Sequence, residues 1–293
     1  MLAALGGRVR PLCVDASVLD GGAFALRDLD ELEVGAGSAR QRLGLAGARG
    51  WVRRLSAPGW RAGTTAGSRD AAVRAAHVAL VAALASHPLV DWLTPYPRLF
   101  ATENKLRQAA HARRLGIRTP RTAVVSDRHE IPAELGDPIV AKPLGPGQFI
   151  GGEGEARVVW AAELARDDPR LTALAGAPFL LQERLRARRH VRVVTCGEQA
   201  WTCALDADAV SLDWRRDDDA HHSFVPSRDS IVESQALALA RDLGLGYSSQ
   251  DWIDDGTDAA AFIDLNPAGQ WLFLPAPVSA EVSEAVAAHL ARP

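Results

Sequence analysis

The sequence has 293 residues, of which 47% are hydrophobic, and its formal net charge is -3. Such a chain can bury a sizeable core, most simply in about two domains, and it is not disordered as a whole. Its slight negative charge excludes proteins that hold nucleic acid by bulk charge. No apolar run reaches the roughly 18 residues of a membrane helix, and the short N-terminus, charged from Arg8 onward, does not resemble a secretory signal. We therefore expect neither a nucleic-acid nor a membrane partner.

Cysteine and lysine usage adds two observations. The three cysteines, Cys13, Cys196 and Cys203, are odd in number and lack CxxC spacing, which indicates reduced thiols in a cytoplasmic protein. Only two of the 33 basic residues are lysines, Lys105 and Lys142. The preference for arginine most simply reflects a compositional bias of the coding DNA. The two lysines that remain are conspicuous in that background.

The first ninety-odd residues are predicted to form a small α/β unit. Strands are expected at 9–14 and 51–55, with a loop-rich, glycine-rich stretch between them. Apolar residues at helical spacing then predict a helix over 70–86, which Pro88 ends. The segment 93–98, with two prolines, is typical of a linker and predicts a domain boundary.

The middle of the chain predicts alternating helix and strands. A helix is expected from about Glu103 to Leu115, with Thr102 as its N-cap and Gly116 at its end. Strands are expected at 122–125 and 139–141. Lys142 then emerges from a strand end, and the glycines of 145–154 predict a flexible loop.

The last third predicts mainly antiparallel strands. They are expected at 179–183, 191–195, 199–205, 247–253 and 260–265, with hairpins joining the second to the third and the fourth to the fifth. Ser230 and Glu233 form a capping box that opens a helix ending at Gly244. Ser279 is expected to cap a terminal helix with Val282, Val286 and Leu290 inward.

Asp264 and Asn266 are two residues apart on a predicted strand, so their side chains leave the same face. If the preceding turn is centred between Thr257 and Asp258, Asp251 pairs with Asp264. Two carboxylates and an amide oxygen suit Mg²⁺ held together with substrate phosphates. The alternative is that Asp264 and Asn266 only shape a turn before the proline that follows, and this pattern alone leaves both interpretations open.

A wider pattern includes these residues. Its members are, in chain order, Lys105 near a helix start, Lys142 before a glycine-rich loop, Glu183 at the end of an apolar strand, Arg192 on the next strand, and Asp251, Asp264 and Asn266. From about Asn104 to Leu274 this order resembles the ATP-grasp pattern. The segments ENKLRQAAHARRLGIRTPRTAVVSD, IVAKPLG, LLQERL, DWR and IDLNPAGQWLFL resemble in particular the graspetide synthetases, microviridin-type ligases that macrocyclise ribosomal peptides.

The resemblance implies an α/β (α+β) ATP-grasp fold in three segments. Residues 1–95 would be a pre-ATP-grasp α/β domain, which lacks the usual first strand and helix before RVRPLCVD. Residues 96–178 would be the central α/β subdomain, and residues 179–293 the C-terminal subdomain with an antiparallel sheet.

The resemblance also implies a role for each site residue. Lys105 and Lys142 would contact the nucleotide phosphates, Gln182, Glu183, Arg184 and Leu185 would meet adenine largely through backbone groups, and Asp251, Asp264 and Asn266 would hold Mg²⁺. Arg192 would stabilise the transferred phosphoryl group, and Arg215 would bind the acceptor carboxylate or its acyl phosphate. These cations are needed because a carboxylate that attacks a phosphate brings anion to anion.

The implied activity is ATP-dependent macrocyclisation of a precursor peptide with a leader and a core. Asp or Glu carboxylates of the core would be phosphorylated and joined to Thr or Ser hydroxyls as esters, or to Lys amines as amides, with release of ADP and phosphate. ATP and Mg²⁺ are the implied cofactors, the cytoplasm the implied location, and a homodimer is compatible with the resemblance. The alternatives are a ligase that acts on free amino acids or a protein tail, and a non-catalytic nucleotide- or peptide-binding relative.

Two residues depart from the family pattern. Asp264 replaces the usual glutamate of the metal-binding strand, and His190 replaces an aspartate two residues before Arg192. The acidic and histidine-rich run from Asp217 to His222 is interpreted as a solvated loop rather than a metal site, because it lacks regular ligand spacing. The arginines from Arg184 to Arg192 are interpreted mainly as a solvated edge. No Ser-His-Asp arrangement or nucleophilic cysteine is apparent, which argues against covalent catalysis.

Overall fold

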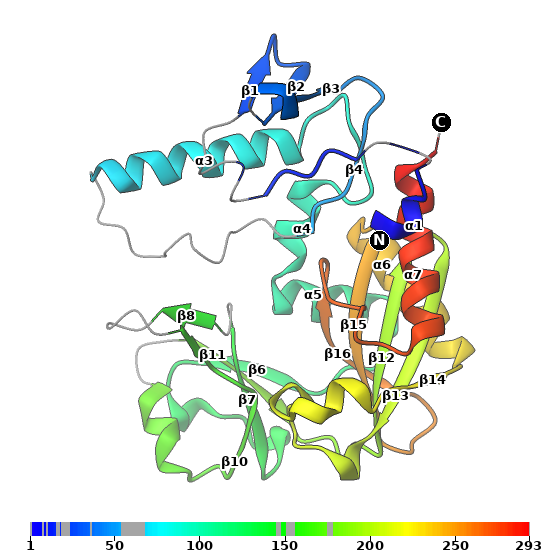
Figure 1. Ribbon diagram of the computed structural model, residues 1–293. Coiled ribbons are helices and arrows are strands. Elements are labelled where there is room, and N and C mark those ends of the chain that lie inside the picture. The colour runs from blue at the N-terminus through cyan, green and yellow to red at the C-terminus, as the bar shows by residue number, and fades with distance from the viewer. Residues whose placement is uncertain are drawn as a thin grey trace. The chain divides into compact units, whose positions relative to one another are not determined.

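The structure is a computed structural model. It describes residues 2–7, 9, 11–15, 18, 24–35, 37–53, 68–144, 148–150, 156–174 and 178–292. The chain divides into two compact units: unit 1 comprises Met1–Leu99 with Ala280–Pro293, and unit 2 comprises Phe100–Ser279 (Figure 1). Within the described ranges, no helix combines the length and the apolar character needed to cross a membrane.

Unit 1 is built around a small antiparallel meander. Its elements are α1 (Leu2–Leu5), β1 (Phe24–Arg27), β2 (Glu31–Val34), β3 (Gln41–Gly44), the parallel pair β4 (Arg49–Gly50) and β5 (Asp91–Trp92), α3 (Arg69–Ala85) and most of α7 (Ala276–Leu290). Leu32, Val34 and Leu45 are buried at the centre of the meander, and Leu84 of α3 packs against them. The predicted helix over 70–86 is thus confirmed as α3.

The two strands expected in unit 1, and the loop expected between them, were wrong. The described residues of 9–14 and 51–55 contain no strand, whereas the stretch between them, expected to be a loop, holds the meander. Its strands are only four residues long, and β2 buries a carboxylate, Glu33, which is paired with Arg27, Arg40 and Arg42. A buried charge and short strands remove the hydrophobic alternation by which such strands are recognised in a sequence.

Two helices follow where a linker and one helix were expected. α4 (Tyr96–Thr102) begins inside the expected linker, and its proline lies in the first turn, where the lack of an N–H costs no hydrogen bond. α5 (Lys105–Arg114) is capped by Asn104, whose side chain accepts hydrogen bonds from Leu106 N (3.0 Å) and Arg107 N (3.1 Å). Thr102 therefore ends α4 and does not cap α5.

The first sheet of unit 2 has four antiparallel strands in the order β10 (Ala162–Leu164), β7 (Ile139–Pro143), β11 (Phe179–Glu183), β6 (Thr122–Val125). The predicted strands 122–125 and 179–183 are confirmed, and β7 continues two residues beyond its predicted end, so Lys142 lies within the strand.

The three segment boundaries proposed above remain a proposal. β11 lies between β7 and β6 in this sheet, although the proposed boundary at 178/179 assigns it to the last segment.

A hairpin occupies part of the predicted glycine-rich loop. β8 (Gln148–Ile150) pairs with β9 (Ala156–Val158), while 145–147 and 151–155 lie outside the described residues. Short 3-10 turns complete the irregular parts of unit 2: η2 (Arg128–Glu130), η3 (Ala133–Leu135), η4 (Pro169–Leu174), η5 (Ala207–Ala209), η6 (Trp214–Arg216) and η7 (Asp218–His222).

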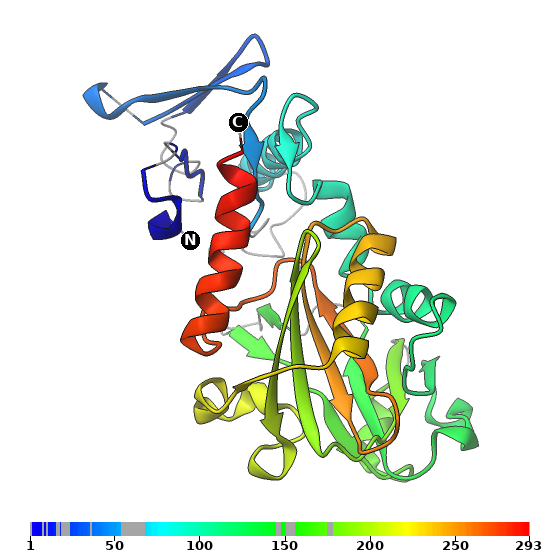
Figure 2. The ribbon, with the colours of Figure 1, turned by 90° about the vertical axis from the view of Figure 1, so that its right-hand side faces the viewer.

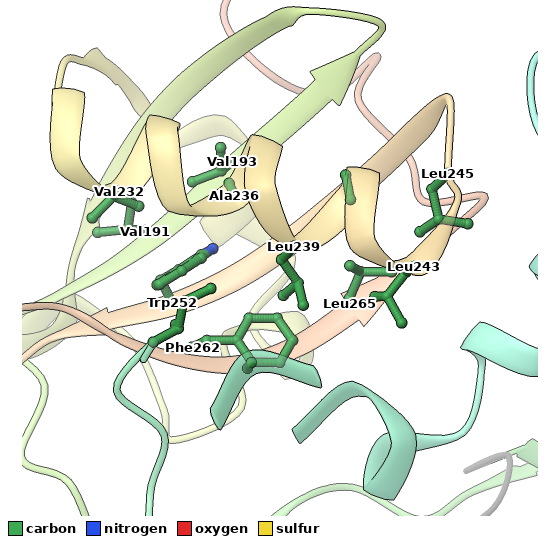
Figure 3. Packing of buried hydrophobic residues seen from close by; sticks show 13 residues of the cluster. Val191, Val193, Val232, Ala236, Leu239, Leu243, Leu245, Trp252, Phe262 and Leu265 are labelled. Carbon is green, nitrogen blue, oxygen red and sulfur yellow. The ribbon is translucent and has the colours of Figure 1, made fainter. Parts of the chain in front are cut away.

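The second sheet of unit 2 has five antiparallel strands in the order β14 (Val225–Ser227), β13 (Gln199–Asp206), β12 (Arg189–Cys196), β15 (Tyr247–Asp254), β16 (Ala261–Asn266). Both predicted hairpins are confirmed. Helix α6 (Ser230–Leu243) runs along one face of this sheet (Figure 2). Its Leu239 contributes to a cluster that includes Val191, Val193, Trp252 and Phe262 (Figure 3).

Two helix starts differ from the expectation. The N-cap of α6 is Asp229, whose side chain accepts hydrogen bonds from Ile231 N and Val232 N. Glu233 closes no capping box, because its Oε1 accepts a hydrogen bond from Thr202 Oγ1 instead (3.0 Å). The predicted end of α6 at Gly244 is confirmed by a left-handed φ of 73°. α7 begins at Ala276, three residues before the expected cap.

Candidate active site

The register of the second sheet brings the predicted charged residues together. Asp251 on β15 pairs with Asp264 on β16, as the turn symmetry predicted, and with Arg192 on β12. Because side chains alternate along a strand, Trp252 lies in the apolar cluster under α6 while Asp251 takes the other face. A register shift between these two residues leaves Ile263 of β16 unpaired. One face of the sheet therefore packs a core and the opposite face carries charged side chains.

Arg192 is the most deeply buried of the predicted site residues that carry a charge. Its side chain is 8% exposed, its Nη1 lies 2.6 Å from Asp251 Oδ1, and its Nη2 donates to Gln270 O at 3.3 Å. Its guanidinium also lies 6.0 Å from the centre of the Phe273 ring. Within the described chain, its buried Nε has no hydrogen-bond partner. A guanidinium held by one carboxylate with a donor to spare can accept a further anion.

The two lysines lie on different elements near the same carboxylates. Lys105 is the first residue of α5, and its Nζ lies 3.4 Å from Asp264 Oδ1. Lys142 is partly buried on β7, and its pKa is lowered, first by burial and also by Lys105 and Arg215, while Asp264 and Asp251 oppose the shift. These mutual electrostatic effects place both lysines, both aspartates and Arg215 in one neighbourhood of unit 2.

Arg215 is held by two contacts that the sequence did not reveal. Its Nε and Nη2 each donate to the buried Asp213 at 2.7 Å, and its guanidinium lies 5.7 Å from the centre of a Trp160 ring. Burial alone would raise the pKa of Asp213, but the hydrogen bonds and charge of Arg215 hold that pKa below its ordinary value. The same hydrogen bonds raise the pKa of Arg215. Arg215 is therefore a fixed cation with its remaining donors free for a carboxylate.

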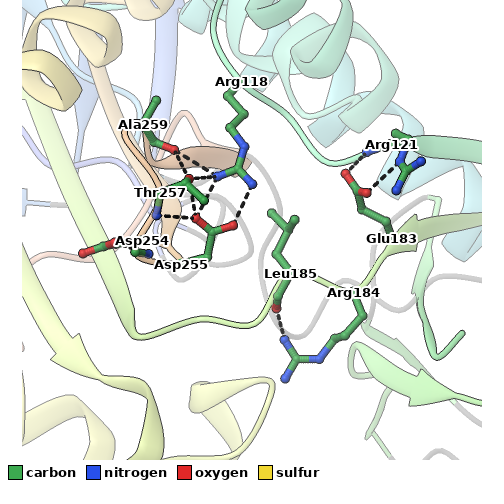
Figure 4. Close-up of polar contacts among 10 residues, drawn as sticks. Arg118, Arg121, Glu183, Arg184, Leu185, Asp254, Asp255, Thr257 and Ala259 are labelled. Atoms are coloured by element: carbon green, nitrogen blue, oxygen red, sulfur yellow. Dashed lines mark hydrogen bonds and ion pairs between the residues drawn. The ribbon is translucent and has the colours of Figure 1, made fainter. Parts of the chain in front are cut away.

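The strand end from Gln182 to Leu185 makes several internal contacts, and Figure 4 shows those of Glu183, Arg184 and Leu185. Gln182 donates to Thr122 Oγ1 at 3.1 Å, and Glu183 accepts from the backbone N (2.8 Å) and the Nε (2.7 Å) of Arg121. Arg184 is bonded to Leu185 O and to Glu163. Two backbone groups are engaged as well, because Glu183 N donates to Arg121 O and Leu185 O accepts from Arg184. The nucleotide contacts that the resemblance implies for this segment remain a proposal.

Asn266 and Asp264 also shape the local chain. The exposed Asn266 accepts a hydrogen bond from Ala268 N at 2.9 Å, and Asp264 Oδ1 accepts one from Leu265 N at 3.1 Å. The turn interpretation therefore holds for both side chains, without excluding a metal role, because each keeps further lone pairs. No group of three or more His, Cys, Asp or Glu among the described residues could enclose a metal. Two aspartates and one amide oxygen fit Mg²⁺ that is bound partly by substrate phosphates.

The run from Asp217 to His222 is only partly solvated, which corrects our interpretation. Asp217 accepts hydrogen bonds from the backbone N (2.6 Å) and the Oγ (2.8 Å) of Ser211. The half-buried His221 packs edge-on against Trp214 and Phe273, with ring centres 5.1 and 5.0 Å apart. An aromatic cluster thus anchors this loop, and Phe273 connects it to Arg192.

Burial keeps the side chains of two residues near the site uncharged at neutral pH. His190 lies two residues before Arg192 on β12, and burial lowers its pKa, so it is neutral at ordinary pH. Cys203 pairs with Arg192 in the sheet, and burial raises the pKa of its thiol to about 11. A thiol with such a pKa is not a nucleophile at neutral pH. Cys203 is therefore not a candidate for covalent catalysis.

Sequence reasoning missed three residues that organise the site: Asp213, Trp160 and Gln108. Asp213 belongs to the quoted DWR segment, and its two-residue separation from Arg215 was a usable signal. Gln108 is 2% exposed and hydrogen-bonded to Leu265, which lies between Asp264 and Asn266. Nothing in a polar helical segment indicates that this glutamine is buried.

Comparison with family models and with curated proteins gives no match for this chain. Solved structures do match. The macrocyclase MdnC from Microcystis aeruginosa MRC, bound with the precursor peptide MdnA, has a TM-score of 0.79 at 21% identity, and the match covers 98% of this chain and 93% of that chain. A RiPP-associated ATP-grasp ligase from Chryseobacterium gregarium, in complex with ADP and a leader and core peptide, has a TM-score of 0.78 at 19% identity, covering 91% and 83%.

A third match is the ATP-grasp ligase PsnB, complexed with a minimal precursor, with a TM-score of 0.69 at 18% identity and coverage of 98% and 92%. At such identities the likeness concerns the fold. It extends over almost the whole length of the chain, and the antiparallel sheets of unit 2 agree with the predicted α/β class. The chain therefore has the ATP-grasp fold, in the form found in MdnC and in these two ATP-grasp ligases.

Proposed function

We propose that the protein is an ATP-dependent peptide macrocyclase. It would phosphorylate Asp or Glu side chains of a ribosomal precursor peptide and join them to Thr or Ser hydroxyls, or to Lys amines, of the same peptide. The observation that carries the proposal is the convergence of Lys105, Lys142, Asp251, Asp264 and Arg215 in one neighbourhood. Support also comes from the fold, because MdnC is a macrocyclase bound with its precursor peptide and the Chryseobacterium ligase binds ADP with a leader and core peptide.

Each step of the reaction needs charge compensation that these side chains can supply. A carboxylate oxygen of the peptide attacks the γ-phosphorus of ATP, and the bond to the leaving ADP oxygen breaks. A hydroxyl or amine of the peptide then attacks the acyl carbon, loses its proton, and phosphate leaves. Both steps gather negative charge on phosphoryl oxygens, and preorganised cations stabilise such charge strongly in a site shielded from water.

We assign roles by position. Lys105 and Lys142 would hold the nucleotide phosphates, and the spare donor of Arg192 would meet the transferred phosphoryl group. Arg215 would hold the acceptor carboxylate, since Asp213 and Trp160 fix its guanidinium from two sides. Asp251, Asp264 and Asn266 would bind Mg²⁺, which screens the phosphates from the incoming carboxylate. The strand end from Gln182 to Leu185 would meet adenine through its backbone.

The test is to incubate the purified protein with Mg-ATP and the short peptide encoded beside its gene, and to follow peptide mass and ADP. We expect ADP release together with a product lighter by one water for each ring. A mass gain would instead identify a ligase that adds free amino acids, and nucleotide binding without turnover would identify a non-catalytic relative. Absence of both water loss and ADP release would exclude the proposal. Because the reaction consumes ATP, we place it in the cytoplasm.

A further inference from the structure

Gln108 of α5 lies against the outer edge of β16. This strand is last in the five-stranded sheet, so its outward backbone groups have no neighbouring strand. Gln108 Oε1 accepts a hydrogen bond from Leu265 N at 3.0 Å, and its Nε2 donates to Leu265 O at 2.7 Å. The amide side chain thus pairs with Leu265 as the backbone of another strand would.

The same amide ties β16 to the helical segment before the site. Its Nε2 also donates to Thr102 O, the last residue of α4, at 2.7 Å. Gln108 lies one turn after Lys105 on α5, and the two residues share one side of the helix. One helix therefore presents a lysine to the Asp264 carboxylate and a glutamine to the backbone of the next residue.

The location of Leu265 gives this contact its importance. It lies between Asp264 and Asn266, the two candidate Mg²⁺ ligands on β16, whose side chains leave the face opposite to its own. The Leu265 N–H is shared, because Asp264 Oδ1 also accepts from it at 3.1 Å. Because Gln108 Oε1 shares the Leu265 N–H hydrogen bond, Asp264 Oδ1 accepts less of it and is more available to bind a cation.

We propose that Gln108 is a positioning residue for the metal-binding strand, an inference that rests on the proposed function. It fixes the backbone of Leu265 and relieves the Asp264 carboxylate of the Leu265 N–H. Loss of the amide would remove the Gln108 hydrogen bonds of Leu265 O and Thr102 O and one of the two hydrogen bonds of Leu265 N. The Leu265 N–H would then depend on Asp264 alone and compete with the metal for its oxygen.

A matched pair of variants separates positioning from mere stability. Gln108→Met removes the amide while keeping the volume. Gln250→Met does the same to a fully buried glutamine of β15, whose Nε2 donates to Ala236 O and Ser248 Oγ, both at 2.9 Å, on the face that packs against α6. Both variants lose buried hydrogen bonds, so both should lower the melting temperature. Gln250 pairs with Leu265 through the sheet backbone, which the substitution keeps, whereas its side-chain amide bonds Ala236 and Ser248. The Gln108 amide, by contrast, bonds the Leu265 backbone beside the candidate ligands.

The measurement is calorimetric binding of ADP to the full chain across a Mg²⁺ titration, with metal-free ADP as the reference. We expect Gln108→Met to raise the Mg²⁺ concentration needed for half-maximal enhancement of ADP binding by about tenfold or more, with metal-free ADP binding unchanged. Gln250→Met should keep the wild-type Mg²⁺ requirement. A wild-type requirement in Gln108→Met overturns this inference alone. ADP binding that ignores Mg²⁺ in the wild-type chain overturns it together with the proposed function.

Should Gln108→Met not fold, Gln108→Asn provides the same test. Its amide is one methylene shorter and cannot reach Leu265 and Thr102 at the observed distances together. We expect the Mg²⁺ requirement to rise in this variant as well, and a wild-type requirement in it would overturn the inference.

Discussion

Replacing Lys142 by methionine should stabilise the protein and abolish its response to nucleotide. In the structure the Lys142 ammonium is partly buried on β7, and burial lowers its pKa from the ordinary 10.5. Asp264 and Asp251 act on it by Coulomb attraction and not through a hydrogen bond. A cation held in this way costs folding free energy, so it is expected to remain only because it binds an anion.

The size and the sign of the effect follow from this environment. A single stabilising substitution commonly adds about 0.5–2 kcal/mol to the free energy of unfolding, which for a large domain is a rise of roughly 1–8 °C in melting temperature. Because the folded pKa of Lys142 is lowered, the unfolded state binds more protons between that pKa and 10.5. The stability gap between Lys142→Met and wild type is therefore full below the folded pKa, closes as pH rises from that pKa to 10.5, and is absent above 10.5.

The assay is thermal unfolding followed by circular dichroism at several pH values, with and without Mg-ADP. Lys142→Met should melt at a higher temperature than wild type without nucleotide at pH 7, and should gain nothing from Mg-ADP. Lys142→Arg is the control, since it keeps the charge but offers a planar guanidinium in place of a compact ammonium. It should show no gain in stability and a reduced response to Mg-ADP. A lower melting temperature for Lys142→Met, or a gap that does not close with pH, would refute this reasoning.

Two further substitutions address the arginines. A Cβ at Gly269 would lie 2.5 Å from Ser249 Cβ and 3.2 Å from Arg192 Nη2. Gly269→Ala should therefore lower the free energy of unfolding, measured by denaturant titration, by about 1–3 kcal/mol and should reduce ATP turnover. Unchanged turnover would show that Arg192 is not displaced. Asp213→Asn removes the charge that fixes Arg215. We therefore expect a raised KM for the peptide in steady-state kinetics and an unchanged ADP affinity in calorimetry. An unaltered peptide KM would contradict the role of the pair.

The sequence contains enough information to predict the second sheet of unit 2. Three of its strands, β12, β13 and β15, have eight residues each, whereas the three-residue β14 was not predicted. The pairing of Asp251 with Asp264 was deduced correctly from chain positions, although the pairs nearer the turn are centred on Thr257 and a register shift beside Asp251 restores the deduced pairing. Arg192 joins that pair because β12 is the other neighbour of β15. Such predictions succeed when local pattern and register agree.

Other features depend on partners that are distant in the sequence. Gln108 and Leu265 are 157 positions apart, and no periodicity shows that this polar helical residue is buried. The β-meander of unit 1 was missed for a local reason, because one of the buried residues of its four-residue strand β2, Glu33, is a carboxylate paired with nearby arginines. In both cases a polar side chain occupies an interior position because hydrogen bonds, at Gln108, or ion pairs, at Glu33, compensate its burial. Propensity and hydrophobic patterns do not report such partners.

The charges of the candidate site favour nucleotide that arrives together with metal. Three carboxylates and four cations converge: Asp213, Asp251 and Asp264 with Lys105, Lys142, Arg192 and Arg215. Three of the cations are already paired with carboxylates, and His190 is kept neutral by burial. The net single positive charge is too small to offset a triphosphate, whereas Mg²⁺ adds two further charges and occupies carboxylate oxygens. Metal-free ATP would have to break these ion pairs to bind. The site should therefore bind Mg-ATP more tightly than metal-free ATP, before any phosphoryl transfer takes place.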